Sequence, residues 1–199
     1  MTTKSRPIIM SSDSVRAILE NRKSQTRRVM KPQPIVKNSQ FRKDILWYAY
    51  KGEFHDVTPG DSLYGNLPYQ IGDRLWVREA WKEINAPCAY KEDLSGYKKR
   101  IVYRADDADY IEWQSPMFMP RWASRLTLEI TNVRCERVQD ITCDGVIAEG
   151  YGRGINYIQA EIAFANAWDK LNAKRGYGWD TNPWVWVIEF KKIEGGDNE

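Results

Sequence analysis

Segments in which apolar and polar residues alternate constrain the fold of this chain most. In the clearest of them, at 124–133, leucine and isoleucine alternate with threonine and glutamate. A second segment at 74–79 alternates in the same way, and an apolar run at 184–190 follows near the end of the sequence. Alternation with a period of two is typical of strands that bury one face. We therefore expect a fold built mainly on a sheet.

Helical patterns are fewer. A helix at 13–21 is expected after a short strand at 7–10, and it ends at Asn21, because asparagine tolerates the left-handed conformation that closes many helices. The longest helix is expected at 155–172, with one apolar stripe that consists of Ile155, Ile158, Ile162, Ala165 and Trp168. Since helices do not join most of the strands, the pattern favours an α+β fold with a small curled sheet or barrel over a parallel α/β sheet.

Two segments, at about 31–71 and 82–119, read as insertions into a single domain that spans 1–199. The first contains a predicted hairpin at 45–57, with its turn at 51–52. The second is polar and rich in turn residues, and we expect one strand in it at 101–103.

Charge and cysteine content exclude several classes. The net charge is only +3, but residues 1–43 carry eleven lysines and arginines against two acidic residues, so this part would attract a phosphate or an RNA strand. Three cysteines without a CxxC pair and a single histidine predict no metal site, no disulfide framework and no cofactor. No apolar run approaches the roughly 18 residues of a membrane span, so we expect a soluble, cytoplasmic protein with no membrane partner.

The stretch at 21–29 concentrates basic side chains around one hydroxyl. Lys23 and Thr26 lie three residues apart, among Arg22, Arg27 and Arg28. A lysine whose pKa is lowered by burial or by neighbouring positive charge can take the proton of a threonine hydroxyl and make it a nucleophile. The spacing alone is weak, and by itself it fits a solvated loop better than a site.

A carboxylate on the predicted strand at 74–79 is the natural partner for this pair. Leu75, Val77 and Glu79 share one face of that strand. If this face is interior, Glu79 is a buried carboxylate that needs a partner, and without one its pKa rises.

Several segments resemble the ASCH domain, a PUA-like fold with the signature G-x-K-x-x-[TE]-x-R. Lys23, Thr26 and Arg28 fall on its lysine, threonine and arginine, and Asn21 stands where the signature has glycine. The segment 72–79, with its glycine turn, is similar to the family's second strong segment, which ends in glutamate. The segments 119–125 and 182–186 look like parts of the larger phage- and prophage-encoded ASCH proteins.

This resemblance implies a PUA-like mixed β-barrel flanked by helices, with inserted hairpin and loop segments. It also implies an amidohydrolase that removes the acyl group from N4-acetylcytidine or a related modified pyrimidine nucleoside. The catalytic set carried over by the motif is Lys23 as base, Thr26 as nucleophile and Glu79 as the group that handles the leaving proton. Arg28 or a backbone N–H would stabilise the oxyanion.

A basic and aromatic segment is the candidate wall for a nucleobase or a phosphate. It comprises Arg121, Trp122, Ser124 and Arg125. An equally good interpretation places Trp122 in the core and the arginines on a solvated face. Arg28 and Arg78 complete the expected substrate-binding residues.

Two alternatives to the enzyme stay open. In the first, the same pocket binds RNA or a nucleotide without amide hydrolysis, with ribonuclease activity as a variant. In the second, the chain is a phage accessory protein that acts through protein contacts, with the hairpin at 45–57 as its interface. Trp47, Tyr48 and Tyr50 motivate this alternative, as aromatic side chains expected on the surface. The sequence sets neither the exact substrate nor the oligomeric state.

Overall fold

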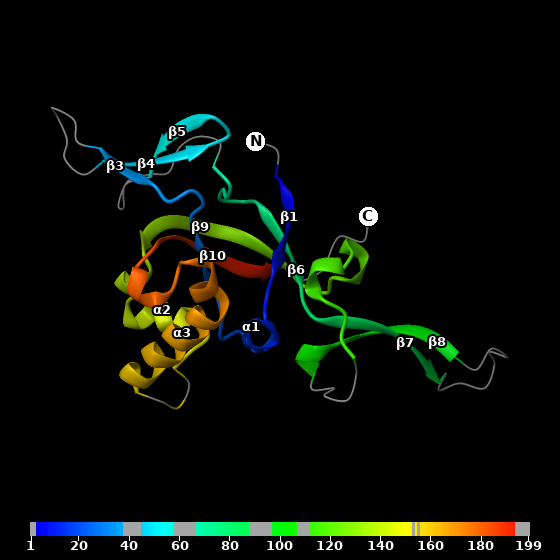
Figure 1. Ribbon diagram of the computed structural model, residues 1–199. Helices are drawn as coiled ribbons and strands as arrows, with labels where there is room; N and C mark the ends of the chain where they lie inside the picture. The colour runs from blue at the N-terminus through cyan, green and yellow to red at the C-terminus, as the bar shows by residue number, and fades with distance from the viewer. Residues whose placement is uncertain are drawn as a thin grey trace.

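The computed structural model describes residues 3–37, 45–57, 67–87, 97–106, 112–152, 154 and 156–193. The fold is mixed α+β. A five-stranded sheet runs through the centre, helices α2 and α3 cover one side of it, and two small sheets project at opposite ends (Figure 1). The predicted fold class is therefore confirmed at this level.

The central sheet mixes parallel and antiparallel pairs. Its strands, in spatial order, are β1 (Ser5–Ile9), β6 (Arg74–Arg78), β9 (Thr127–Arg137), β10 (Trp184–Ile193) and β2 (Gln25–Val29). The pair β1–β6 is parallel and the other pairs are antiparallel. In the strand pairing of the described residues, β1 and β2 stand at opposite ends of the order. Closure of the expected barrel is therefore not shown by backbone pairing.

The sheet separates two apolar cores. Its inner face carries Leu75, Val77, Leu128, Ile130 and Ile188, which pack with Val15 and Ile18 of α1. Its outer face carries Val185 and Val187, which pack under α2 and α3. Between Glu189 and Phe190 the register shifts, because β9 has one extra residue there; Val133 and Ile130 of β9, three residues apart, therefore both join the inner core.

Three α-helices begin at side-chain caps. They are α1 (Ser12–Leu19), α2 (Cys143–Ala148) and α3 (Tyr157–Asn172), capped by Ser11, Thr142 and Asn156. Short 3₁₀ turns complete the helical content: η1 (Arg104–Asp106), η2 (Pro116–Phe118), η3 (Arg121–Ala123), η4 (Val138–Asp140), η5 (Ala173–Arg175) and η6 (Trp179–Thr181). No helix in the described ranges is long and apolar enough to cross a bilayer.

The apolar stripe predicted for α3 is wrong for Ile158 and Ile162, and it is confirmed only for Trp168. Ile158 and Ile162 are 67% and 55% exposed, and the buried face consists of Ala160, Phe164 and Trp168. The two aromatic rings bury more apolar area than the isoleucines would, so they decide which face meets the sheet. The first residue of the predicted helix, at 155, lies outside the described residues.

The predicted hairpin at 45–57 is confirmed. Strands β4 (Ile45–Tyr50) and β5 (Glu53–Asp56) pair around a turn in which Lys51 and Gly52 both have positive φ, as a two-residue hairpin turn requires. A third strand, β3 (Ile35–Lys37), pairs with the other edge of β4.

The expectation that the hairpin exposes its aromatic side chains is wrong for Tyr48. Its ring is buried, meets Trp186 edge to face and stacks on Tyr50, while its hydroxyl donates to the Lys31 carbonyl oxygen. Trp47 and Tyr50 are half-buried. The inner side of the hairpin therefore extends the core, which weakens the case for a protein interface there.

The second insertion forms a two-stranded ribbon. Strands β7 (Trp81–Pro87) and β8 (Tyr97–Tyr103) pair antiparallel, so the strand predicted at 101–103 is present and begins earlier. Under the base of the ribbon, Trp81 packs with Met119 and Ala123 in a third, smaller core. This core fixes η2 and η3 against the base of the ribbon.

Candidate functional site

A left-handed turn positions the lysine of the basic stretch. Asn21 has φ 56°, which supplies the conformation for which the ASCH signature uses glycine. The N–H groups of Arg22 and Lys23 both donate to the Ala17 carbonyl oxygen, at 2.7 and 3.0 Å. Lys23 then forms an isolated bridge with Glu149, immediately after α2. The turn thus directs Lys23 inward, and Lys23 is buried.

The Lys23 ammonium binds Glu149. Nζ donates to the Glu149 backbone carbonyl oxygen at 2.8 Å and to its carboxylate Oε2. The two side chains are 3% and 5% exposed, so the pair is almost fully removed from water. Burial of both charges is tolerated because each supplies the other's counter-charge.

The same carboxylate neutralises a second buried cation. Arg27 Nη1 donates to Glu149 Oε1 at 3.1 Å and to the side-chain oxygen of Gln25 at 2.9 Å. On its other side, Arg27 donates to Glu136 from Nε at 3.0 Å and from Nη2 at 2.6 Å. Arg27 is therefore held by the fold and is not available to a ligand.

Burial lowers the pKa of Lys23 below its ordinary value. Loss of hydration is the largest cause, and the charges of Arg28 and Arg27 act in the same direction against the attraction of Glu149. The basic neighbours of Lys23 therefore contribute as the sequence suggested, but burial contributes more.

Thr26 lies on the inner face of the sheet. It pairs with Ile188, which pairs with Val133, and directly paired residues share a face. Thr26 is only 5% exposed, and no described residue forms a hydrogen bond with its hydroxyl. Its hydroxyl therefore keeps its hydrogen-bonding capacity at this face.

Glu79 is also directed toward the inner face but has its own partner. It follows β6 in the phase of Leu75 and Val77 and is 1% exposed. Arg125 donates to both carboxylate oxygens, from Nε at 2.9 Å and from Nη2 at 3.1 Å. Burial raises the pKa of Glu79, and Arg125 opposes this shift.

Thr26 and Glu79 thus point to the inner face, whereas Lys23 shares Glu149 with Arg27, which pairs with Val187 of the outer face. Lys23 pairs with Glu149, Glu79 pairs with Arg125, and Thr26 stays unbonded. Within the described part of the chain, no hydrogen bond joins any two of Lys23, Thr26 and Glu79.

Arg28 connects the two end strands of the sheet. Its Nη2 donates to the Ile9 carbonyl oxygen at 2.7 Å and contacts Met10 Sδ at 3.4 Å. The Met10 N–H in turn donates to the Arg78 carbonyl oxygen at 3.0 Å. The buried Nε atoms of Arg28 and Arg78 have no hydrogen-bond partner among the described residues. The motif arginine is thus next to the end of β6.

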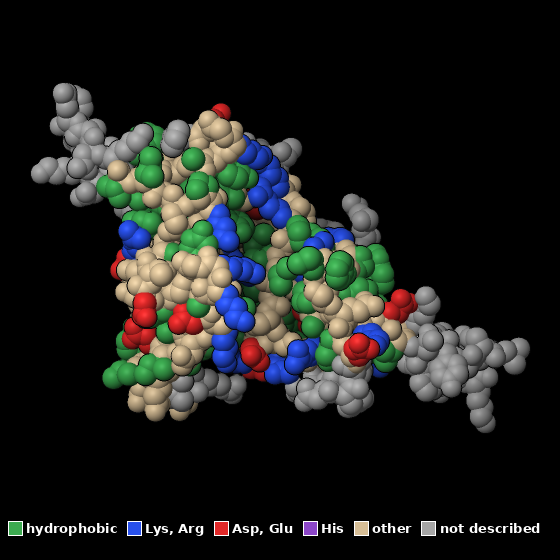
Figure 2. Space-filling view, in the orientation of Figure 1, with side chains coloured by type: hydrophobic (Ala, Val, Ile, Leu, Met, Phe, Trp, Pro, Cys, Tyr) green, Lys and Arg blue, Asp and Glu red, His purple; other side chains and the backbone are tan. Residues whose placement is uncertain are grey.

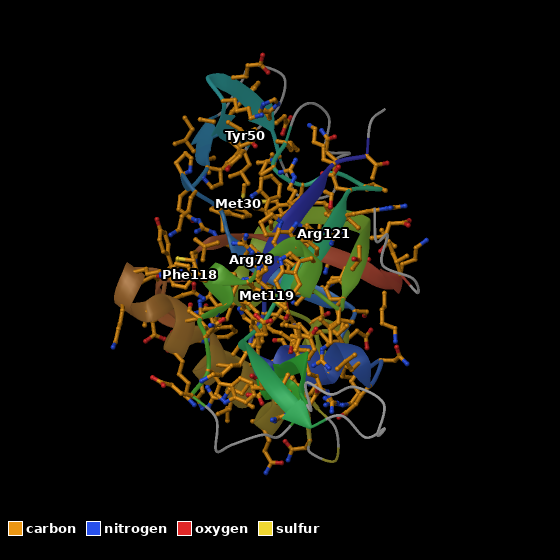
Figure 3. All side chains as sticks on the ribbon, turned by 90° about the vertical axis from the view of Figure 1, so that its right-hand side faces the viewer. Met30, Tyr50, Arg78, Phe118, Met119 and Arg121 are labelled. Atoms are coloured by element: carbon orange, nitrogen blue, oxygen red, sulfur yellow. The ribbon has the colours of Figure 1, made fainter. Side chains whose placement is uncertain are left out.

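Two arginines stack on one tryptophan beside that end. The Arg78 guanidinium lies 4.6 Å and the Arg121 guanidinium 5.7 Å from the centre of the Trp76 ring. Arg78 also donates to the Met117 carbonyl oxygen at 3.1 Å. Figure 3 shows Arg78 and Arg121 near Met119 on the side of the molecule where η2 and η3 lie. We call Arg28, Arg78 and Arg121 the arginine rim.

The molecular surface is hollowed beside η2 and η3. Figure 2 shows this hollow between the part that contains α2 and α3 and the part that contains β7 and β8, with Lys and Arg side chains along its sides. Hydrophobic side chains gather on the surface next to it, over η2 and η3. Basic and apolar side chains therefore lie next to each other on the surface around this hollow.

The remaining residues of the predicted wall have distinct environments. Trp122 is 66% exposed and touches Trp81 only edge to face, so it is a surface ring and not a core residue. Ser124 donates to the Val77 carbonyl oxygen at 2.8 Å. Arg125 is held by Glu79 and by Asp106. Ser124 and Arg125 therefore fix the end of β6, and Trp122 is free to meet a ligand.

Comparisons with known proteins give one structural likeness. No family model matches the chain, and no curated protein matches it. The fold is similar to the crystal structure of an ASCH domain from Lactobacillus crispatus JV V101. The TM-score is 0.44 at 15% identity, and the match covers 95% of this chain and 79% of that chain.

Sequence reasoning did not find Glu149. The residue follows a short helix and lies 126 positions from Lys23, and no local pattern connects the two. The available signal was indirect: if Lys23 is buried, as one route to a lowered pKa requires, it needs a counter-charge. No group of three or more potential metal ligands occurs among the residues with described positions.

A separate polar cavity lies on the other side of β2. It measures about 310 Å³ and is lined by Ser24, Gln25, Thr131, Arg134, Thr142, Asp144, Gly145, Ala148, Glu189 and Phe190. Among the residues that line the cavity, Gln25 and Arg134 donate to the Glu189 carboxylate. These polar groups of the lining are therefore already bonded to one another. Neither Lys23 nor Thr26 lines this cavity.

Proposed function

We propose that this chain binds a nucleotide or an RNA strand at the arginine rim. The observation that carries the proposal is the stacking of Arg78 and Arg121, from β6 and η3, on the Trp76 ring, with Arg28 of β2 bound to the end of β1 that precedes Met10. Guanidinium groups bind phosphate through paired N–H donors, and exposed aromatic rings beside them stack on bases. Trp122 supplies such a ring.

The geometry also supports the strength of these contacts. Arg78 and Arg121 stack on Trp76, so little side-chain freedom is left to lose when a phosphate binds. Within the described residues, the buried Nε atoms of Arg28 and Arg78 are donors without partners, and a bound phosphate would satisfy such donors. The arginines thus supply positive charge in a preorganised arrangement, and Trp122 supplies a ring on which a base can stack. Both properties suit an RNA strand.

Titration of RNA binding against salt tests this proposal. Arg121→Gln removes a rim cation, and we expect weaker binding and a salt slope reduced by about one unit for each phosphate that is no longer neutralised. Arg134→Gln is the matched control, because Arg134 pairs with Val187 and so lies on the outer face of the sheet. Equal binding by wild type and by Arg121→Gln, or no binding by either, would overturn the proposal.

Amide hydrolysis of an N4-acylated cytidine is the second candidate, and the unbonded Thr26 hydroxyl favours it. In this reaction Thr26 Oγ attacks the acyl carbon while deprotonated Lys23 takes the hydroxyl proton. The C–N bond then breaks, Glu79 delivers a proton to the leaving amine, and water hydrolyses the acyl-threonine. The lowered pKa of Lys23 and the raised pKa of Glu79 suit a base and an acid.

This second candidate requires Lys23 to part from Glu149, and Glu79 from Arg125, during the reaction. The test is hydrolysis of N4-acetylcytidine by wild type, by Thr26→Ser, which keeps a hydroxyl, and by Thr26→Val, which keeps the shape. We expect turnover by the first two and loss of turnover in Thr26→Val. Normal turnover by Thr26→Val would exclude Thr26 as the nucleophile.

A further inference from the structure

The segment of η2 and η3 exposes three large apolar side chains beside the arginine rim. Phe118, Trp122 and Met117 are 75%, 66% and 62% exposed. Such a group on one short segment costs free energy in water and commonly marks an interaction site. Figure 3 shows Phe118 directed away from Met119 and toward the outside of the molecule.

Buried neighbours and hydrogen bonds hold the segment of η2 and η3 in place. Met119 and Ala123, which alternate with the exposed rings along the chain, are 1% and 2% exposed in the small core with Trp81. The Ser115 hydroxyl caps η2 by accepting from the Met117 N–H at 3.3 Å. Arg78 donates to the Met117 carbonyl oxygen. The backbone that carries the exposed side chains is therefore fixed by these contacts. Their exposure follows from the fold.

The charge of the segment indicates its partner. Residues 116–125 include Arg121 and Arg125 and no acidic residue, and Arg78 lies directly under η2. Aromatic rings interleaved with arginines match single-stranded nucleic acid, because bases stack on the rings while phosphates meet the guanidinium groups. A duplex keeps its bases stacked on each other and cannot use these rings.

We propose that Phe118 and Trp122 form two successive stacking platforms for the bases of a single-stranded nucleic acid that continues outward from the arginine rim. This inference rests on the nucleotide-binding function proposed above and specifies its ligand as an unpaired strand. A mononucleotide fills the rim alone, whereas an oligonucleotide reaches the rim and both platforms. The sequence offered Trp122 either as a wall for a nucleobase or as a core residue, and its exposure favours the first role; Phe118 is added by its own exposure.

Fluorescence anisotropy with a labelled single-stranded RNA of about ten nucleotides tests the inference. Phe118→Ala should weaken oligonucleotide binding about tenfold, the order expected for one stacked base, and Trp122→Ala should act similarly. Phe118→Tyr keeps a ring and should bind like wild type. Ile158→Ala is the matched control, because it removes an apolar side chain of similar exposure from α3.

The ligands separate the two proposals. Under the inference, a mononucleotide binds wild type and Phe118→Ala equally, the single strand binds wild type more tightly than the mononucleotide, and a duplex of the same sequence gains nothing from Phe118. If the mononucleotide binds but Phe118→Ala leaves single-strand binding unchanged, base stacking on Phe118 is rejected. Nucleotide binding at the arginine rim is then retained. If neither ligand binds wild type, both proposals fail.

Discussion

The Glu149 carboxylate lies between two buried cations and accepts from Lys23 through Oε2 and from Arg27 through Oε1. A single acidic side chain thus stabilises the lysine of the candidate catalytic set and the arginine that anchors β2 under the helices. Arg27 has a second carboxylate in Glu136, whereas Lys23 has no second one among the described residues, so Lys23 depends more on Glu149. This dependence can be measured.

Glu149→Gln should lower the free energy of unfolding by about 3–5 kcal/mol, because it leaves a buried ammonium without its counter-charge. Chemical denaturation gives the value. The same substitution in a Lys23→Met background should cost clearly less, since the cation is then absent. Equal losses in the two backgrounds would show that Glu149 acts only through Arg27 or through packing.

The pH dependence of stability should report Glu79. Burial raises its folded-state pKa above the ordinary value of 4.5, so the folded state binds its proton more tightly than the unfolded state. The stability from this group is complete below 4.5 and is lost as the pH rises through the folded-state pKa. Denaturation across that window should show wild type losing stability relative to Glu79→Gln. A constant difference between the two proteins would contradict the raised pKa.

Gly150 should resist substitution for two separable reasons. Its φ is +95°, and a Cβ there would lie 3.0 Å from the Ala17 Cβ and 3.3 Å from the Lys23 Cβ. Gly150→Ala should therefore cost backbone strain of about 1–3 kcal/mol and a further loss from crowding beside Lys23. Gly72→Ala is the control, because its φ is +86° and no described heavy atom lies within 4 Å. Equal thermal unfolding midpoints for the two variants would remove the crowding contribution.

The two faces of α3 should respond oppositely to substitution. Phe164→Ala empties a buried position between α3 and the sheet and should cost about 3–5 kcal/mol. Ile158→Lys changes an exposed side chain and should alter the free energy of unfolding by about 0.5 kcal/mol or less. A large loss in Ile158→Lys would restore the helix phase predicted from the sequence.

Local patterns in the sequence predicted most of the elements. Alternation located β6 and β9, the residues at 51–52 located the hairpin turn, and Asn21 marked the left-handed turn. These features depend on neighbouring residues, so local patterns suffice to predict them. The phase of α3 depended on which side chains fill the space over Val185 and Val187, and only the assembled sheet decides that.

Contacts between residues far apart in the sequence could not be predicted from local patterns, and much of the site depends on them. The sequence indicated that Glu79 faces inward and needs a partner, but Arg125 lies 46 positions away on another element. Trp122 was left between a core and a surface role, because its exposure depends on Trp81 and on the ribbon above it. Phe118 belongs to no sequence motif, and only its position on η2 sets it beside the arginines.

The contact of Arg28 with Ile9 differs in kind from the rest of the sheet. A ladder of backbone hydrogen bonds survives most substitutions, because every residue except proline supplies the same groups. The junction between the first and last strands in the described sheet order uses a guanidinium instead, and it exists only while position 28 is arginine. The direct contact between these two strands therefore depends on a single side chain. The phosphate contact proposed for Arg28 would use the same guanidinium, so a substitution at position 28 would change ligand binding and the contact between the end strands together.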